Sequence, residues 1–198
     1  MSEQTLLRPE TTIVPARRQL LVRGTQAVLS AGAIAILAGC ESMVTSKNAS
    51  AASASNDIQV LNTALGLEYE GIAAYQVGAE SGLLQPPVLA VAVKFQDQHK
   101  KHAELLASTV KKLGGMPVMP KSKYDFPTGN LKTQEDVLRF AAGLEQGAAQ
   151  AYYGAVPVFA NKDLSSAAAS IMADEAMHWA ILRNALGEDP IPTAFAIS

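Results

Sequence analysis

The sequence predicts an all-α domain, a four-helix bundle with a long crossover between its second and third helices. Alanine is abundant and β-branched runs are few among the 198 residues, which favours helices over strands. Four segments carry apolar residues at spacings of three and four, and glycine or proline separates them. We expect the bundle over residues 56–187, followed by a C-terminal tail over residues 188–198.

The charge balance bears on the class of partner. Only 17% of the residues are charged and the net charge is −2, so the chain has no lysine- and arginine-rich face to meet phosphates. We therefore expect no nucleic-acid partner.

The first 40 residues have the pattern of an export signal. The twin arginine Arg17-Arg18 precedes an apolar run over residues 27–38, which is short for a membrane span. The run ends in Leu37-Ala38-Gly39-Cys40, which resembles a bacterial lipobox with Cys40 as the lipidation site. A plain N-terminal membrane anchor is the alternative. Because Cys40 is the only cysteine, no internal disulfide is expected.

This signal predicts a lipoprotein anchored to a membrane through its N-terminal lipid, in the periplasm or on the outer cell surface. The twin arginine resembles the signal of the pathway that exports folded proteins, and the general secretory route stays open. Residues 41–55 are rich in serine and alanine, and we expect them to form a flexible tether between lipid and bundle.

The first helix is expected to begin at Asn56 or Asp57, either of which can cap it, and to run to about Ser81. Its face is apolar except for Glu68. The second helix is expected over residues 87–113, where Gly114-Gly115 ends it.

Residues 116–132 contain three prolines and no helical pattern, so they predict the crossover. Thr133 is expected to cap the third helix, with Asp136 at the capping-box position. This helix is expected to run to about Phe159, with Pro157 kinking or ending its last turn. The fourth helix is expected to begin near residues 163–165 and to end at Leu186-Gly187.

The two halves of the domain resemble each other. Gly66-Leu67-Glu68 is followed by Ala74-Tyr75, and Gly143-Leu144-Glu145 is followed by Ala151-Tyr152. Each tyrosine therefore lies 7 residues after its glutamate (75 − 68 and 152 − 145). The histidines follow at similar separations, 34 residues from Glu68 (102 − 68) and 33 from Glu145 (178 − 145). Each half is therefore expected to form a hairpin that brings its glutamate level with its histidine.

The fourth helix carries Glu175-x-x-His178, a carboxylate and an imidazole about 5–6 Å apart on one helix face, close enough to share a metal ion. Together the two hairpins predict that five side chains converge on one site: Glu68, His102, Glu145, Glu175 and His178. Tyr75 and Tyr152 lie two turns from the glutamates, and we expect their hydroxyls to hydrogen-bond to a carboxylate.

This pattern resembles the ferritin-like superfamily of ferritins, bacterioferritins and rubrerythrins over residues 57–187. With the export signal, the chain is similar to exported ferritin-like domain proteins. The resemblance implies two metal ions held by a glutamate from each of two helices and a Glu-x-x-His from each of the others. It further implies iron handling or oxidant defence, with ferroxidase-like or peroxide-consuming activity.

The chain departs from that pattern at one position. When His102 is aligned with His178, His99 stands where the first hairpin should supply its bridging glutamate, and the alternative register, Gln96-x-x-His99, lacks the carboxylate too. Three carboxylates leave two divalent ions with an uncompensated positive charge, which is costly in a buried site.

Several alternatives therefore stay open. The centre is dinuclear with His99 as an unusual ligand, or it holds a single ion, or His99 is only a hydrogen-bond partner of a ligand. We expect one or more transition-metal ions; the resemblance implies iron, and zinc or manganese are the alternatives. In a different class, the bundle has lost its metal and acts as a structural or binding module of the cell envelope. The sequence also leaves a homodimer open.

Overall fold

The computed structural model describes residues 48–197, with side chains from residue 52 onward. The expected export signal, the lipidation site Cys40 and the first part of the tether lie outside these residues. Within the described part of the chain, no helix is both long and apolar enough to span a membrane.

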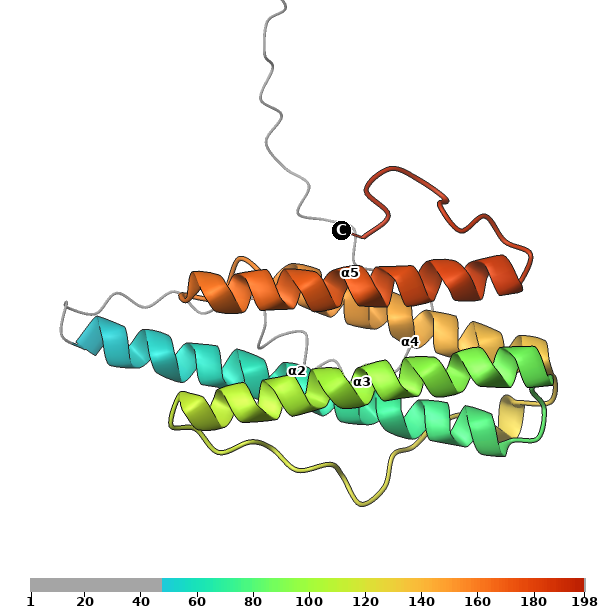
Figure 1. The fold of residues 1–198 in the computed structure, drawn as a ribbon, viewed down its shortest axis with the longest axis horizontal. Helices are drawn as coiled ribbons and strands as arrows, with labels where there is room; N and C mark the ends of the chain where they lie inside the picture. Colours follow the sequence, from blue (N-terminus) through green and yellow to red (C-terminus); the bar gives the residue numbers. More distant parts are fainter. Residues whose placement is uncertain (1–47, 198) are drawn as a thin grey trace, which may run out of the picture.

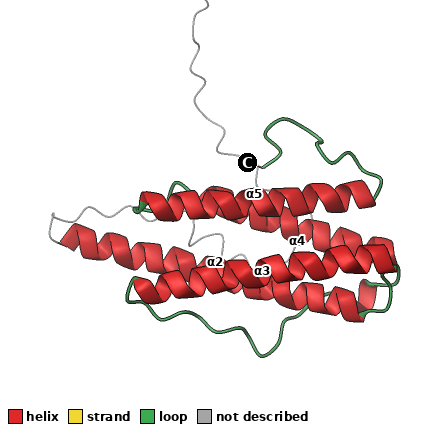
Figure 2. Cartoon of the chain, viewed as in Figure 1, coloured by secondary structure: helices red, strands yellow, loops and turns green. Residues whose placement is uncertain are grey.

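The described chain folds as an all-α four-helix bundle, as the sequence predicts (Figures 1 and 2). With the labels of Figure 1, the helices are α2 (Asn48–Glu80), α3 (Pro86–Lys112), α4 (Gln134–Ala155) and α5 (Lys162–Ala185). A single 3-10 turn, η1 (Thr128–Asn130), precedes α4. Helix α2 packs along α3 and α4 packs along α5, so each half is a hairpin, and α2 also contacts α4.

The helix ends follow local chemistry. Two prolines begin α3, where their missing N–H groups cost nothing, and Gly114 with φ +80° ends it in a left-handed turn. Helix α4 begins with the predicted capping box between Thr133 and Asp136. It ends at Ala155, two residues before Pro157, so the proline ends the helix rather than kinking it.

The predicted start of the first helix is wrong. Helix α2 begins at Asn48, so residues 48–55, which we expected in the tether, are helical. Alanine has the highest helix propensity, and no glycine or proline interrupts this stretch. Asp57 consequently does not cap α2. Its carboxylate instead accepts hydrogen bonds from the backbone N–H groups of Ala160 (2.9 Å) and Asn161 (3.2 Å), which ties α2 to the start of α5.

The crossover returns the chain along the outside of the bundle, because α3 and α4 run in the same direction (Figure 1). Asn62 on α2 holds its first part. The Asn62 side-chain amide donates to the carbonyl of Met116 (3.0 Å) and accepts from the N–H of Val118 (2.8 Å). Further along, Phe126 packs edge-on against Phe140 of α4, with ring centroids 5.6 Å apart.

Two apolar clusters form the core and leave a gap between them. The first gathers residues such as Leu65, Leu106, Tyr152 and Ile171 from all four helices. The second gathers Tyr75, Phe95, Leu138, Ala142, Trp179 and Leu182. On every helix the candidate metal ligands lie between the residues of these two clusters, so the polar centre is sealed by apolar packing at both ends.

Candidate metal centre

The six predicted ligand side chains converge in the middle of the bundle. All are buried, and the most exposed, His102, retains only 8% of its accessible surface. They form two overlapping sets, in each of which the ligand atoms lie within 4.8 Å of one another. The first half-site contains Glu68, His99, His102 and Glu175, and the second half-site contains His99, Glu145, Glu175 and His178. His99 and Glu175 therefore belong to both.

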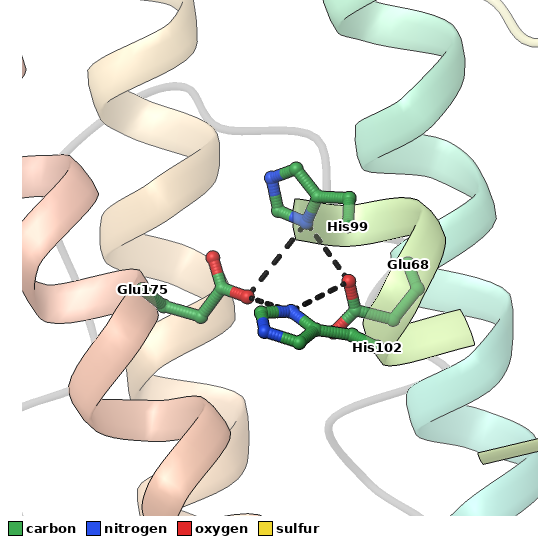
Figure 3. Close-up of side chains that lie close together, drawn as sticks. All are labelled: Glu68, His99, His102 and Glu175. Atoms are coloured by element: carbon green, nitrogen blue, oxygen red, sulfur yellow. Dashed lines mark hydrogen bonds and ion pairs between the residues drawn. The ribbon is translucent and has the colours of Figure 1, made fainter. Parts of the chain in front are cut away.

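In the first half-site, side chains from α2, α3 and α5 point toward one another (Figure 3). His99 Nδ1 lies 2.8 Å from Glu68 Oε2. His102 Nδ1 lies 3.1 Å from Glu175 Oε1 and 3.5 Å from Glu68 Oε2. Two carboxylates and two imidazoles thus face a common space.

The second half-site repeats this arrangement with the other atoms of the two shared residues. His99 Nε2 lies 3.3 Å from Glu145 Oε1. His178 Nδ1 lies 3.3 Å from Glu145 Oε2 and 3.4 Å from Glu175 Oε2. Glu175 therefore turns one oxygen to each half-site, and His99 turns one ring nitrogen to each.

The two tyrosines hydrogen-bond to carboxylates, as the sequence predicts, and they do so across the halves. Tyr75 of α2 donates to Glu145 of α4, and Tyr152 of α4 donates to Glu68 of α2 at 2.5 Å. Burial, together with the neighbouring carboxylate, raises the pKa of both hydroxyls well above the usual value, so both keep their protons and donate. Each carboxylate is thereby fixed in orientation.

Two residues that the sequence analysis did not single out orient the terminal imidazoles. His102 Nε2 lies 3.2 Å from Asp174 Oδ2, and His178 Nε2 lies 2.9 Å from Gln98 Oε1. With the outer nitrogen donating, Nδ1 of each ring is directed into its half-site, as is usual for metal-binding histidines. Gln98 and Asp174 each lie four residues before a histidine, so the internal repeat carried a signal for them.

The structure decides between the two registers considered for α3. Gln96 points away from the centre, because its amide donates to the carbonyl of Ile72 (3.0 Å) and to Gln76 Oε1 (2.8 Å). His99-x-x-His102 is therefore the pair that faces Glu175-x-x-His178.

Without metal, the carboxylates hold protons on the three imidazoles. Burial acts to lower the pKa of His102, but the neighbouring carboxylates of Glu175 and Glu68 outweigh it and raise the pKa to about 10. The same balance, with Glu145 and Glu175 as partners, raises the pKa of His178 to about 9. Burial likewise opposes protonation of His99, yet its carboxylate partners raise its pKa well above the usual value. Three imidazolium groups then neutralise three carboxylates.

The residues present fit a metal centre, because some of their buried polar atoms lack a well-aligned hydrogen bond. Within the described part of the chain, both oxygens of Glu175 and Nδ1 of His102 are buried and form no well-aligned hydrogen bond, although imidazole nitrogens lie 3.1–3.7 Å from the Glu175 oxygens. A buried carboxylate that lacks hydrogen bonds is costly, whereas a cation among these atoms would satisfy them. The donor set of imidazoles and carboxylates suits divalent first-row transition metals.

A small cavity adjoins the centre between α2 and α4. Its volume is about 20 Å³, and its lining includes Glu68, Gly71, His99, Glu145 and Ala148. This volume holds about one water molecule. The centre therefore has room beside His99 for one small exogenous ligand.

Comparison with known proteins agrees with the fold. A family model described as a ferritin-like domain matches residues 56–188. No curated protein matches the chain significantly.

Three solved structures share the architecture. A conserved hypothetical protein of Mycobacterium tuberculosis is 23% identical, with a TM-score of 0.63 over 72% of this chain and 99% of that chain. A ferritin-like diiron-carboxylate protein of Bacillus anthracis is 22% identical, with a TM-score of 0.59 over 68% of this chain and 97% of that chain. The bacterioferritin of Desulfovibrio desulfuricans, described with its diiron site, is 21% identical, with a TM-score of 0.60 over 68% of this chain and 80% of that chain.

Proposed function

Because the chain belongs to the ferritin-like domain family, we propose that its buried centre binds two divalent transition-metal ions, one in each half-site. The observation that carries this proposal is the pair of overlapping ligand sets, together with the buried Glu175 oxygens, which form no well-aligned hydrogen bond with the described residues. Iron is the first candidate, since two structural neighbours are described as diiron proteins. Zinc and manganese are the alternatives that the ligand types admit.

The chain's own residues would prepare the site for these ions. Glu68 and Glu145 are held in place by the tyrosine hydroxyls, and His102 and His178 by their outer hydrogen bonds. Bound metal supplies Lewis acidity and, with iron, redox capacity. The apolar clusters at both ends exclude water, and the cavity beside His99 leaves space for one small molecule.

We propose iron handling or oxidant defence as the role. A buried centre with room for only a small ligand supports chemistry on oxygen or peroxide rather than on a large organic substrate. The corresponding test mixes the iron-loaded protein with hydrogen peroxide and follows oxidation of Fe²⁺ and loss of peroxide. Rates equal to those of free Fe²⁺ would remove the redox role and leave metal binding intact.

Metal content tests the central proposal. Elemental analysis of the purified protein is expected to give two ions per chain, and the double variant Glu175→Ala, His178→Ala is expected to lose both, because Glu175 serves both half-sites. Glu104→Ala, which removes an exposed carboxylate of α3, is the control and should bind as the parent does. Circular dichroism checks that each variant is folded.

A metal-free bundle acting as a module of the cell envelope is the second candidate. The observation that favours it is the mutual neutralisation of the three carboxylates and three imidazoles, which lets the core exist without metal. Equal and negligible metal in the parent and the double variant, with both folded, would support this candidate and exclude the first.

We also propose that the protein is exported and lipid-anchored at Cys40, on the periplasmic or outer face of a membrane. The lipobox-like end of the apolar run supports this proposal. Cys40→Ser should release the protein from the membrane fraction and abolish labelling with radioactive palmitate. Unchanged fractionation and no label in the parent protein would favour the plain N-terminal anchor.

A further inference from the structure

The imidazole of His99 is placed differently from those of His102 and His178. Those two rings each turn one nitrogen into a half-site and the other outward to a hydrogen-bond partner. Among the described residues, His99 has no hydrogen-bond partner outside the two half-sites. Its Nδ1 lies 2.8 Å from Glu68 Oε2 in the first half-site, and its Nε2 lies 3.3 Å from Glu145 Oε1 in the second.

Glu175 likewise directs one ligand atom to each half-site. It is the residue that corresponds to His99 in the other half, because 175 − 99 and 178 − 102 both equal 76. Glu175 Oε1 lies 3.7 Å from His99 Nδ1 in the first half-site, and Oε2 lies 3.4 Å from His178 Nδ1 in the second. His99 therefore presents two donor atoms to two half-sites, as the carboxylate does on the opposite side.

Helix α2 leaves space for the His99 ring at Gly71. A Cβ at Gly71 would lie 3.2 Å from both Cε1 and Nδ1 of His99, so any larger residue would press on the imidazole. On the other side, the ring of Tyr75 lies 5.4 Å from that of His99 between centroids. The position corresponding to Gly71 in the second half, offset by 77 residues as Glu145 is from Glu68, is Ala148. The glycine thus occurs in the half that carries the histidine.

Charge counting gives an independent reason. Three carboxylates compensate only three of the four charges on two divalent ions. An imidazole bound through one nitrogen is neutral and leaves the deficit, which is costly in a buried site. An imidazole bound through both nitrogens is an imidazolate and supplies the fourth negative charge.

We propose that His99 bridges the two metal ions through Nδ1 and Nε2 and so replaces the bridging glutamate at this position. The inference rests on the proposed function, since it requires an ion in each half-site. When the bridge forms, the N–H bonds of the ring break, their protons go to solvent, and two nitrogen–metal bonds form in their place. Nothing is oxidised or reduced.

Zinc X-ray absorption of the full-length protein loaded with Zn²⁺ alone tests the bridge, with elemental analysis on the same samples. The ring and two zinc–nitrogen bonds of about 2 Å hold the ions farther apart than the roughly 3.5–4 Å of ordinary two-metal sites. The parent protein is expected to bind two Zn²⁺ with no zinc–zinc signal in that range. His99→Glu, which restores the carboxylate, is expected to gain such a signal.

Affinity measurements give a second readout. His99→Gln is expected to weaken binding of both ions by more than the roughly 10–100-fold typical of an outer hydrogen-bond partner. The matched variant His102→Gln removes a ligand of the first half-site only and should weaken chiefly one ion.

The outcomes separate the two proposals. Two ions in the parent with a short zinc–zinc separation, or unchanged binding of two ions by His99→Gln, would overturn the bridge and leave the metal centre standing. No bound zinc in a folded parent would overturn both. Should a variant fail to fold, the spectrum of the parent decides alone.

Discussion

The substitution Gly71→Ala separates the metal-binding role of His99 from the stability of the bundle. Two effects compete at this position. Alanine in a helix interior is about 1 kcal/mol more favourable than glycine, which stabilises α2. The new Cβ, however, would lie 3.2 Å from two atoms of the His99 ring, and overpacking of this kind typically costs 1–3 kcal/mol. We therefore expect a net change between about 0 and −2 kcal/mol in the free energy of unfolding.

Metal affinity should respond in one direction only. The ring has to move away from α2 to relieve the contact, and this movement displaces both nitrogens from their half-sites. If the strain of about 1–3 kcal/mol falls on the metal-bound geometry, affinity drops by roughly 5- to 150-fold, at 1.4 kcal/mol per factor of ten. Competition with a chromophoric zinc chelator measures this change, and urea denaturation measures stability.

Gly66→Ala is the matched control, because Gly66 lies in the same helix and its added Cβ would meet no atom of the described residues within 4 Å, apart from its own stretch of helix. It should stabilise the bundle by about 1 kcal/mol, or roughly 2–4 °C in melting temperature, and leave metal affinity unchanged. If Gly71→Ala stabilised the protein as much as Gly66→Ala and bound zinc as the parent does, the packing of His99 against Gly71 would have no role in the centre.

Three further predictions address the surroundings of the ligands. Tyr152→Phe leaves a buried carboxylate oxygen of Glu68 without its donor and should lower the free energy of unfolding by about 1–3 kcal/mol in urea denaturation. The control Tyr153→Phe, at an exposed neighbouring tyrosine, should lower it little, and equal losses would contradict the prediction. Asp174→Asn should lower the affinity for one zinc ion by roughly 10–100-fold in chelator competition and leave the affinity for the other unchanged, since only the ring of His102 loses its carboxylate partner. An equal loss of affinity for both ions would contradict this prediction. The metal-free protein should lose stability as pH rises, because the folded-state pKa values of His102 (about 10) and His178 (about 9) lie above the ordinary value of 6.5. The stabilisation that these two protonated imidazoles contribute is therefore complete below pH 6.5 and lost above pH 10. Thermal melts in chelator between pH 6 and 10.5 test this, and a flat profile would refute it.

The internal repeat predicted most of the fold and the convergence of the six side chains, because helix periodicity and a fixed glutamate-to-tyrosine spacing are local properties. Periodicity places Glu68 and Glu145 on apolar faces, and a hairpin then brings each level with its histidine. The early start of α2 was missed, since serine and alanine suit both a linker and a solvated helix. The local pattern of residues 48–55 cannot distinguish the two.

The orientation of individual atoms could not be predicted from the sequence. The hydrogen bond from Tyr75 to Glu145 in the other half, for example, depends on how α2 and α4 approach each other. The two-sided placement of His99 likewise depends on Gly71, a residue 28 positions away in the chain (99 − 71). Such contacts are set by tertiary packing, which spacing within one helix does not specify.

The histidine at position 99 need not mean that the centre has decayed. In the metal-free protein, three imidazolium groups balance three carboxylates, and the core is neutral. With two divalent ions and a bridging imidazolate, three carboxylates and one imidazolate balance four positive charges, and the core is neutral again. A glutamate in place of His99 would also make the loaded state neutral, but four carboxylates against two imidazolium groups would leave the metal-free core with two uncompensated negative charges (4 − 2), which is costly. With His99, the same buried side chains therefore form a neutral core in two states: the metal-free protein with protonated imidazoles, and the protein with two divalent ions bound.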